Sequence, residues 1–253
     1  MDRRIVLITG ASSGIGRSCA FSFAEAGYHV IIAGRRGERL SEVEIEIRNK
    51  FQVQVFSLEL DVTNRQHVDI AINNLPVGFR NIDVLINNAG LALGLEPLQE
   101  GNPENWDRMI DTNIKGLLNV SHAIMPLMIK QGRGHIINIG SIAGREVYPN
   151  GNVYCATKAA VDSITKGMRI DLLPFGIRVT QIAPGAVETE FSLVRFSGDE
   201  QKAKRVYIGF EPLNPDDVAG VVLYAAGLPP HININDLLLM PTAQAAATQI
   251  HRT

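Results

Sequence analysis

Four polar side chains have the types and the spacing needed for proton transfer. Tyr154 and Lys158 stand four residues apart in a segment of helical periodicity, so both lie on one face of a helix. A neighbouring ammonium favours the phenolate and lowers the pKa of a tyrosine, which suits the phenol to acid–base work. Such pairs also occur in helices by chance, so the prediction depends on Ser141 and Asn113. Ser141 ends an expected strand and Asn113 lies in an expected helix, so that all four groups can converge.

The hydrophobic pattern predicts a scaffold that brings strand ends together. Short β-branched runs alternate with longer segments of helical periodicity, and most runs are apolar at every position, which is typical of strands buried on both faces of a parallel sheet. We therefore expect the α/β class, with a Rossmann-like doubly wound parallel sheet and helices on both faces. Strands are expected at 4–9, 28–34, 53–60, 82–88, 134–141 and 177–185, and helices at 14–26, 37–50, 64–74, 103–130, 152–173 and 215–227.

Helix boundaries carry their own signals. Asn102 before Pro103 predicts an N-cap with proline at the first helical position, and Gly176 marks the end of the helix that starts near Asn152. Pro126 lies late in the long fourth helix, where it predicts a kink or an early end.

Composition favours one domain and excludes several function classes. The 253 residues carry 24 Lys+Arg against 26 Asp+Glu, a net charge of −2, with no basic arm for nucleic acid and no linker near the middle of the chain. Cys19 and Cys155 lack zinc or CxxC spacing, so we expect small buried residues. No segment has the length and composition of a membrane span or secretory leader, so we expect a soluble cytoplasmic protein.

A glycine-rich turn follows the first strand. Gly10, Gly14 and Gly16 lie in TGASSGIG, at the entry to the first helix. Glycines at such a turn let the backbone approach a pyrophosphate, which the helix N-terminus also attracts. A glycine trio is a weak signal alone, but its position between strand and helix predicts dinucleotide binding. The motif adds Ser12, Ser13 and Ile15 to the candidate cofactor residues.

The end of the second strand predicts which dinucleotide is bound. An acidic residue there would bind the adenosine ribose, whereas this chain has Gly34 followed by Arg35 and Arg36. Two guanidiniums favour a 2′-phosphate, so we expect NADP(H) rather than NAD(H). After the third strand, Asp61 and Val62 are placed to contact adenine, although Asp61 could equally belong to the N-cap region of the next helix.

The segment 188–211 has no clear periodicity and mixes charges of both signs with aromatic residues. A connection of this length in a compact domain is often a lid over an active site. A solvated surface excursion with a few apolar anchors is the alternative interpretation.

Six motifs follow one another along the chain, namely TGASSGIG (9–16), NNAG (87–90), MIDTNIKG around Asn113, NIGS ending at Ser141, YCATK (154–158) and the PG of IAPGAVET. In this order and at these separations they resemble the short-chain dehydrogenase/reductase family over essentially the whole chain. NNAGLALGLEP, NVYCATKA, EFSLVRFSGDEQKA and LPPHININDLLLMP are similar to the NADP-dependent 3-hydroxy acid dehydrogenases, a subgroup that includes serine 3-dehydrogenases and malonic semialdehyde reductases.

The resemblance implies roles for individual residues in one NADP-binding oxidoreductase domain that spans residues 1–253. Tyr154 is then the general acid–base group, and Lys158 lowers its pKa and binds the nicotinamide ribose. Ser141 holds the substrate oxygen, and Asn113 fixes a water that relays protons. No metal is needed, because the hydride chemistry belongs to the cofactor. The family pattern adds Asn87, Ala89 and Gly90 along the cofactor, and Pro184, Gly185, Val187 and Thr189 at the nicotinamide carboxamide.

The subgroup implies hydride transfer between NADP(H) and small 3-hydroxy or 3-oxo acids, such as L-serine, L-allo-threonine, 3-hydroxypropionate or 3-hydroxyisobutyrate. A carboxylate in a partly dry pocket needs a cation, and Arg195 in the expected lid is preferred over Arg145. Arg195 could equally be a surface arginine among mixed charges. Glu188 and Glu190 are placed where a substrate amino group could meet them.

Two other functions stay open. One is a reductase of another carbonyl class, such as a sugar, a diketone or a ketoacyl chain. The other is a non-catalytic NADP(H)-sensing protein, against which the intact set of four polar residues argues. The family resemblance also implies a homotetramer, in which Leu117, Val120 and Ile124 either face a neighbouring subunit or face the sheet.

Overall fold

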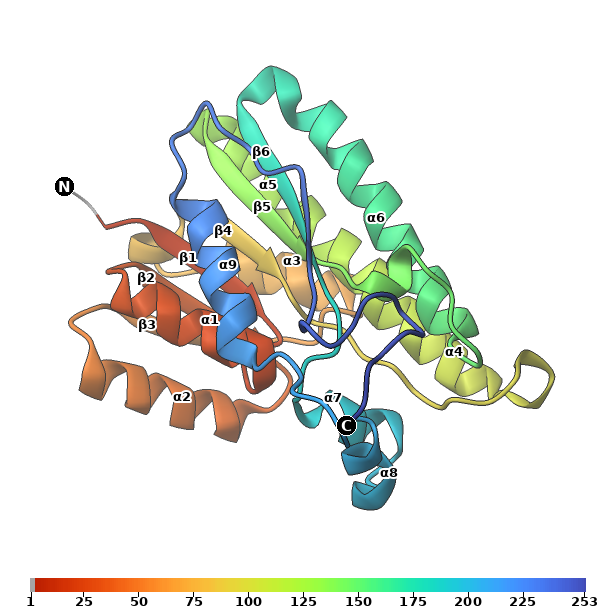
Figure 1. Cartoon of the computed structure of the whole chain (residues 1–253). Coiled ribbons are helices and arrows are strands. Elements are labelled where there is room, and N and C mark those ends of the chain that lie inside the picture. Colours follow the sequence, from red (N-terminus) through yellow and green to blue (C-terminus); the bar gives the residue numbers. More distant parts are fainter. Residues whose placement is uncertain (1–2) are drawn as a thin grey trace.

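Seven parallel strands form one sheet in the order β3-β2-β1-β4-β5-β6-β7 in the computed structural model, which describes residues 3–253 (Figure 1). The chain builds outward from β1 to β3 and then crosses back to β4, so the winding reverses between β1 and β4. This confirms the predicted Rossmann-like fold. The strands are β1 (Ile5–Thr9), β2 (His29–Gly34), β3 (Val55–Glu59), β4 (Ile82–Asn87), β5 (Gly134–Ile139), β6 (Ile177–Pro184) and β7 (Asp236–Leu239).

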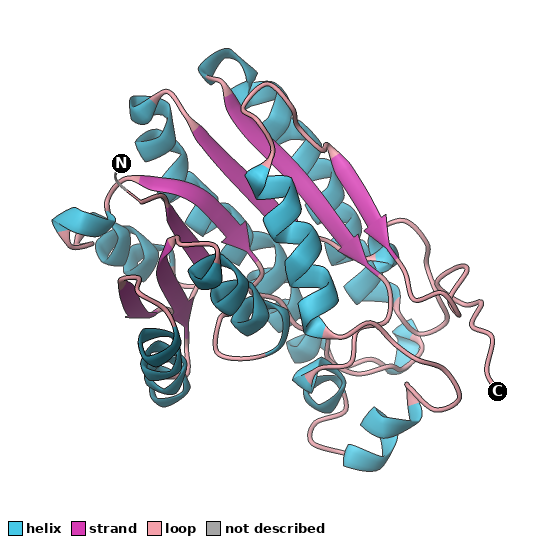
Figure 2. Ribbon diagram, turned by 60° about the vertical axis from the view of Figure 1, so that its left-hand side comes forward, coloured by secondary structure: helices cyan, strands magenta, loops and turns pink. Residues whose placement is uncertain are grey.

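Helices cover both faces of the sheet (Figure 2). Helices α1, α2 and α9 pack on one face, and α3, α5 and α6 pack on the other. Helix α4 continues through a π-helical segment, Asp111–Gly116, into α5. The bounds are α1 (Gly14–Glu25), α2 (Gly37–Lys50), α3 (Arg65–Asn73), α4 (Pro103–Ile110), α5 (Leu117–Gln131), α6 (Asn152–Leu172), α7 (Glu190–Arg195), α8 (Glu200–Arg205) and α9 (Pro215–Gly227).

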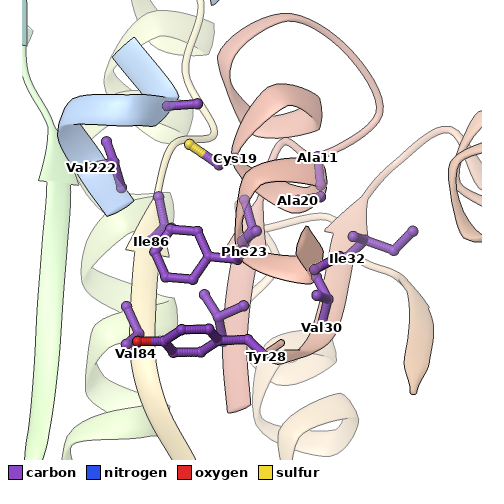
Figure 3. Close-up of a cluster of buried hydrophobic side chains, with 14 of the residues drawn as sticks. Ala11, Cys19, Ala20, Phe23, Tyr28, Val30, Ile32, Val84, Ile86 and Val222 are labelled. Atoms are coloured by element: carbon purple, nitrogen blue, oxygen red, sulfur yellow. The ribbon is translucent and has the colours of Figure 1, made fainter. Parts of the chain in front are cut away.

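The strands are apolar throughout because successive side chains enter two different cores. In β1, Val6 and Ile8 pack under α1 and α9, whereas Ile5 and Leu7 pack under α3 and α5. Figure 3 shows the first of these cores, where the ring of Phe23 stands edge-on to that of Tyr28 at 4.9 Å between centroids. Cys19 is buried in the same cluster, and both cysteines are free, as predicted.

Aligned strand ends put the following loops at one edge of the sheet. Thr9 pairs with Ala33, and Asn87 pairs with Asn138. Residues that come directly after these strands therefore meet across short distances, which is the condition for a site built from separate motifs.

Strand β7 and the break in the long helix differ from the predictions. Asp236–Leu239 is a four-residue edge strand that is half exposed, so it lacks the buried run that marks the other strands. The helix predicted at 103–130 begins at Pro103 with Asn102 as its N-cap, as expected, but its irregularity lies at Asp111–Gly116. Pro126 does not end it early, because α5 continues to Gln131.

The predicted lid, residues 188–211, contains two short helices, α7 and α8, and lies beside the C-terminal end of the chain (Figure 1). Leu117, Val120 and Ile124 are buried in the core against the sheet, so they do not form an outer face. Ile110 and Leu118 are the exposed apolar residues of this region. Within residues 3–253, no helix has both the length and the apolar composition that crossing a membrane requires.

Candidate active site

A cavity of about 450 Å³ opens at the carboxyl ends of the central strands. Its walls come from loops that follow β1 to β6, on both sides of the point where the winding reverses. In a doubly wound sheet this is the place where ligands bind. The predicted residues that line it are Gly10, Ser12, Ser13, Gly14, Ile15, Arg35, Arg36, Asp61, Val62, Ala89, Gly90, Ser141, Tyr154, Lys158, Pro184, Gly185, Val187 and Thr189.

The glycine loop is closely packed beneath this cavity. Gly10 has a φ of 65°, in the left-handed region that favours glycine. A Cβ on Gly16 would lie 2.4 Å from the Gly10 carbonyl oxygen, so Gly16 holds α1 against the loop and does not line the cavity. The Asn88 side chain donates to the Thr9 and Gly10 carbonyls at 2.9 and 3.2 Å, which ties the loop to the end of β4.

Arg36 is fixed over the glycine loop. Its Nε donates to Ser12 Oγ at 3.0 Å, and its Nη2 donates to Ser13 Oγ at 2.6 Å. Its Nη1 donates to Glu190 at 2.9 Å, and Arg39 donates to the other oxygen of the same carboxylate at 2.5 Å. Partial burial raises the pKa of Glu190, but the hydrogen bonds from the two arginines outweigh burial and hold the pKa below its usual range.

Asp61 lines the cavity and also shapes the turn before α3, while its contact with adenine stays a prediction. Its Oδ1 accepts from the backbone N–H and the hydroxyl of Thr63, which shapes the turn before α3, and its side chain lines the cavity. The N-cap itself is Asn64, whose side chain accepts from the His67 N–H at 3.0 Å.

Tyr154, Lys158 and Ser141 meet at the other end of the cavity. Burial raises the pKa of Tyr154, while the guanidinium of Arg195 and the hydroxyl of Ser141 act in the opposite direction. Burial also lowers the pKa of Lys158 to about 8, and its Nζ donates to the Ile139 carbonyl at 2.9 Å. The guanidinium of Arg195 is thus a cation that acts on the phenol, whereas the role of Lys158 in lowering the pKa of Tyr154 stays a prediction.

Asn113 stands behind the cavity wall in the π-helical segment. Its Oδ1 accepts from the Leu91 N–H, and its Nδ2 donates to the Leu91 carbonyl, both at 2.8 Å. Gly90 lies between this amide and Lys158, since a Cβ there would be 3.2 Å from Asn113 Oδ1 and 3.6 Å from Lys158 Nζ. Asn113 thus positions the loop after β4 rather than lining the cavity.

Asn87 does not face the cavity, which corrects its assignment as a cofactor residue. Its side chain donates to Ser121 Oγ and Asn138 Oδ1, both at 2.9 Å, inside the sheet layer. The last residue of β4 points toward α5 because strand side chains alternate between faces. Its neighbour Asn88 lines the cavity instead.

Arg195 lies against Tyr154. Its guanidinium carbon is 5.0 Å from the centroid of the Tyr154 ring and 5.3 Å from that of Phe191. Its Nη2 donates to Tyr148 Oη at 2.7 Å. Its Nε is buried and has no hydrogen-bond partner among residues 3–253. Arg195 does not belong to the cavity wall itself but stands behind Tyr154 and Phe191.

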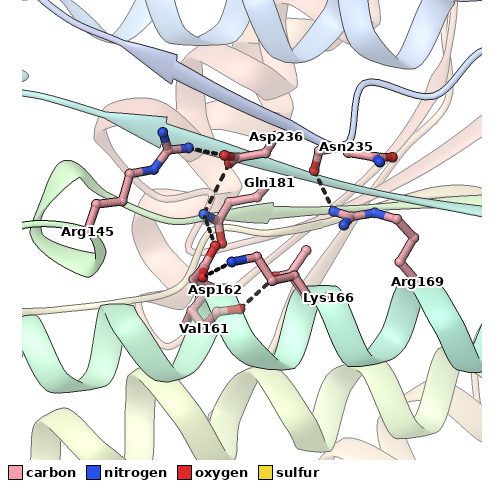
Figure 4. A network of polar contacts seen from close by, with 9 residues as sticks. Arg145, Val161, Asp162, Lys166, Arg169, Gln181, Asn235 and Asp236 are labelled. Carbon is pink, nitrogen blue, oxygen red and sulfur yellow. Dashed lines mark hydrogen bonds and ion pairs between the residues drawn. The ribbon is translucent and has the colours of Figure 1, made fainter.

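Arg145, the alternative cation, is engaged elsewhere. It forms an ion pair with Asp236 on the edge strand β7 (Figure 4). Asp236 also accepts from Gln181, which donates to Asp162 as well, so Arg145 belongs to a network between β6, β7 and α6. Neither arginine lines the cavity, but of the two only Arg195 contacts Tyr154.

Several site residues were not predicted. Asn88 lies inside the quoted NNAG motif, so the motif was a sufficient signal for it. Arg39 follows Arg35 and Arg36 by one helical turn, which would have placed it on the same face. Tyr148 had no signal in the sequence, because only the fold brings it to Arg195. Other residues of the cavity wall are Leu60, Leu91, Arg108, Thr112, Ile139, Gly140, Phe191 and Val194, together with Gly34 and Glu190, which the sequence already indicated.

Comparison with known proteins places these motifs in one family. A model of the short chain dehydrogenase family matches residues 4–199. The chain is 48% identical over 242 residues to "Sulfoacetaldehyde reductase 2" from Chromohalobacter salexigens, with 95% of each chain covered. It is 47% identical over 251 residues to "NADP-dependent 3-hydroxy acid dehydrogenase YdfG" from Salmonella typhi, with 98% of this chain and 100% of that protein covered.

A solved structure is similar over the same length. It is the closed form of a serine dehydrogenase complexed with NADP+, with a TM-score of 0.93 and 45% identity over 98% of this chain and 100% of that one. The family model, the relatives and the shared fold agree with the order of the motifs along the sequence. The chain therefore belongs to the short-chain dehydrogenase family.

Proposed function

We propose that this chain is an NADP(H)-dependent oxidoreductase of small 3-hydroxy acids and their 3-oxo counterparts. The choice of substrate class rests on one observation. The Nε of Arg195, beside Tyr154, is buried and has no hydrogen-bond partner in the described part of the chain. A buried donor of this kind is costly unless a ligand accepts from it. An acidic substrate supplies that acceptor.

The residues around the cavity fit NADP(H). The glycine loop leaves room for a pyrophosphate, and Cβ atoms at Gly10 or Gly16 would collide with Asn88 Nδ2 at 2.9 and 2.5 Å. Arg36 is held over this loop by two serine hydroxyls, so its guanidinium is already oriented for a 2′-phosphate. The 3-hydroxy acid dehydrogenase relative is named as NADP-dependent, and the serine dehydrogenase structure contains NADP+.

The mechanism assigns proton transfer to the chain and hydride chemistry to the cofactor. NADP(H), when bound, supplies or accepts the hydride. Ser141 binds the substrate oxygen, and Tyr154 takes its proton during oxidation or returns it during reduction. Lys158 binds the nicotinamide ribose and, with its pKa lowered by burial to about 8, carries a proton of the relay near neutral pH. Asn113 fixes a water of the relay and holds the loop that contains Gly90.

Arg195 recognises the acidic group of the substrate. The lid helix α7 carries it, together with Phe191, whose ring centroid is 5.6 Å from that of Tyr154. The two rings exclude water from the side of the phenol where the substrate lies, which strengthens an ionic contact. Residues 188–211 therefore act as the lid, with α7 as its inner wall.

A second candidate substrate is a small sulfonate. The relative at 48% identity is named as a sulfoacetaldehyde reductase, and a sulfonate offers a guanidinium three oxygen acceptors where a carboxylate offers two. Sulfoacetaldehyde has its carbonyl next to the acid-bearing carbon, as 3-oxo acids do. The same clamp and the same proton transfer would serve both classes.

A substrate panel tests the proposal. NADPH formation is measured with L-serine, L-allo-threonine, 3-hydroxypropionate, 3-hydroxyisobutyrate, 2-hydroxyethanesulfonate and uncharged alcohols of equal length. We expect the acids to exceed the uncharged alcohols in kcat/KM by at least about tenfold, as for a charged hydrogen bond. Activity confined to uncharged substrates contradicts the acid proposal. The kcat/KM for the sulfonate, compared with the values for the carboxylates, decides between the two acid classes.

A cytoplasmic homotetramer completes the proposal. Ile110 and Leu118 are exposed apolar residues near the π-helical segment, and they replace the buried leucine, valine and isoleucine first considered for a subunit contact. Light scattering after size exclusion measures the mass, and a monomer at micromolar concentration contradicts the tetramer. The two free cysteines are compatible with a reducing compartment.

A further inference from the structure

The lid helix α7 contacts both ends of the proposed cofactor and substrate site. Glu190, its first residue, binds Arg36 and Arg39 beside the glycine loop. Arg195, its last residue, lies against Tyr154. A single six-residue helix thus joins Arg36, one of the two arginines expected to select the cofactor, to the cation expected to bind the substrate.

Glu190 occupies the donors that a 2′-phosphate needs. Its two carboxylate oxygens accept separately from Arg36 and Arg39, at 2.9 and 2.5 Å, so one anion bridges both guanidiniums. A 2′-phosphate is likewise an anion with several acceptors, and its charge exceeds that of a carboxylate. The two anions therefore have the same preferred position.

We propose that Glu190 competes with the 2′-phosphate of NADP(H) for Arg36 and Arg39, and so sets the affinity for the phosphorylated cofactor. This inference rests on the proposed NADP(H) dependence. The competing carboxylate weakens binding of NADP(H) without touching the pyrophosphate or the nicotinamide. It also makes the N-terminal end of the lid part of the cofactor site.

The exposure of the three side chains suits an exchangeable contact. Glu190, Arg36 and Arg39 are 41%, 42% and 46% exposed, and ion pairs in such positions contribute little to stability. Arg36 stays in place when the carboxylate leaves, because Ser12 and Ser13 hold its Nε and Nη2. The incoming phosphate therefore finds an oriented guanidinium at no extra ordering cost.

Nucleotide fragments isolate the contact from catalysis. Calorimetry measures the Kd of adenosine 2′,5′-bisphosphate, which carries the 2′-phosphate, and of ADP, which does not. In Glu190→Gln we expect the bisphosphate to bind about three- to tenfold more tightly than in wild type, as for the loss of competing exposed ion pairs. The Kd of ADP stays within about twofold. Glu188→Gln, which removes an equal charge from an exposed side chain two residues earlier, is the control and leaves both Kd values unchanged.

A double-mutant cycle assigns the effect to the contact itself. If Glu190 acts through Arg39, the gain from Glu190→Gln falls below about twofold in an Arg39→Ala background. An unchanged or weaker affinity for the bisphosphate in Glu190→Gln overturns the proposal, and so does an undiminished gain without Arg39. Failure of the cofactor proposal is distinguishable, because wild type would then bind ADP at least as tightly as the bisphosphate.

Discussion

The guanidinium of Arg195 lies over the ring of Tyr154, 5.0 Å from its centroid. This contact joins two tasks that the sequence argument gave to separate residues. The cation opposes the effect of burial on the pKa of the phenol, and its buried Nε has no hydrogen-bond partner among residues 3–253, so it is the donor that we assign to an acidic substrate. Lys158, four residues from the tyrosine, is itself held by the Ile139 carbonyl.

Replacing Arg195 should raise KM for acidic substrates much more than KM for uncharged substrates. We expect Arg195→Met to raise KM for 3-hydroxypropionate by about 10- to 100-fold, as for loss of a charge-assisted hydrogen bond. Steady-state kinetics with saturating NADP measures this, and KM for an uncharged alcohol should change less than about threefold. Arg145→Met is the matched control, since its partner is Asp236, and its KM should remain that of wild type. Equal effects in the two variants contradict the clamp.

The dependence of kcat on pH should depend on the contact between Arg195 and Tyr154. In the proposed mechanism oxidation needs the phenolate of Tyr154, and the guanidinium of Arg195 acts to lower the pKa of this group against the effect of burial. Arg195→Met therefore raises the pKa, and the rise of kcat with pH moves to higher pH. The measurement is kcat at saturating substrate across pH 6–10. A profile that does not move, or one that moves toward acid, would show that another charge governs the phenol.

Arg36 should select the cofactor more strongly than Arg35. Arg36 is fixed by two serines. Arg36→Ala should therefore raise the Kd of NADPH by about 10- to 100-fold, while the Kd of NADH changes by less than about threefold. Fluorescence titration of both reduced cofactors gives the two Kd values. Arg35→Ala should have the smaller effect, and the pair Arg35→Asp with Arg36→Asn should turn the preference toward NADH. Unchanged selectivity in that double variant refutes the interpretation of the second strand.

Lys158 should cost stability near neutral pH. Its pKa falls to about 8 in the folded protein, below that of an exposed lysine, so the protonated side chain disfavours folding below pH 8. The penalty fades as pH rises from 8 toward the unfolded pKa. Lys158→Met should therefore raise the free energy of unfolding at pH 7 by about 1–3 kcal/mol while abolishing turnover. Urea denaturation at pH 7 and 9.5 measures this, and a gain that is equal at both pH values contradicts it.

Gly16 should tolerate no side chain. A Cβ there would lie 2.4 Å from the Gly10 carbonyl, so Gly16→Ala must push α1 from the loop, at a cost of about 1–3 kcal/mol. Among residues 3–253, no atom of a neighbouring residue lies within 4 Å of a Cβ built on Gly220 in α9, so Gly220→Ala should stabilise the protein by about 0.5–1 kcal/mol. Thermal unfolding compares the two, and similar effects from both substitutions would remove the packing argument.

Much of the fold follows from patterns within single segments. The first six strands and α9 match the predicted positions because unbroken apolar runs and a capped, periodic helix are local signals. β7 lacked such a signal, since it is short and half exposed and depends on its pairing with β6. The break at Asp111–Gly116 could not be predicted because Asn113 is drawn to Leu91 by a contact across the fold.

The site divides in the same way. Gly10, Gly14 and Tyr154 follow from motifs, since backbone approach and acid–base chemistry restrict the residue type at each position. Whether Asn87 or Asn88 faces the cavity depends on where β4 ends, because side chains alternate between the two faces of a strand. The sequence therefore predicted Asn87 as a cofactor residue, whereas Asn88 lines the cavity. The ion pair of Glu190 with Arg36 joins residues 154 positions apart, and only the folded chain reveals it.

The π-helical segment sets a limit on how this chain can change its length. In an α-helix each residue is rotated by about 100° around the axis relative to the one before it. Loss of one residue between Asp111 and Gly116 would make the helix more regular, but it would rotate Asn113 away from Leu91. In Asp111–Gly116, the number of residues in the helix therefore determines where the Asn113 side chain lies in the site.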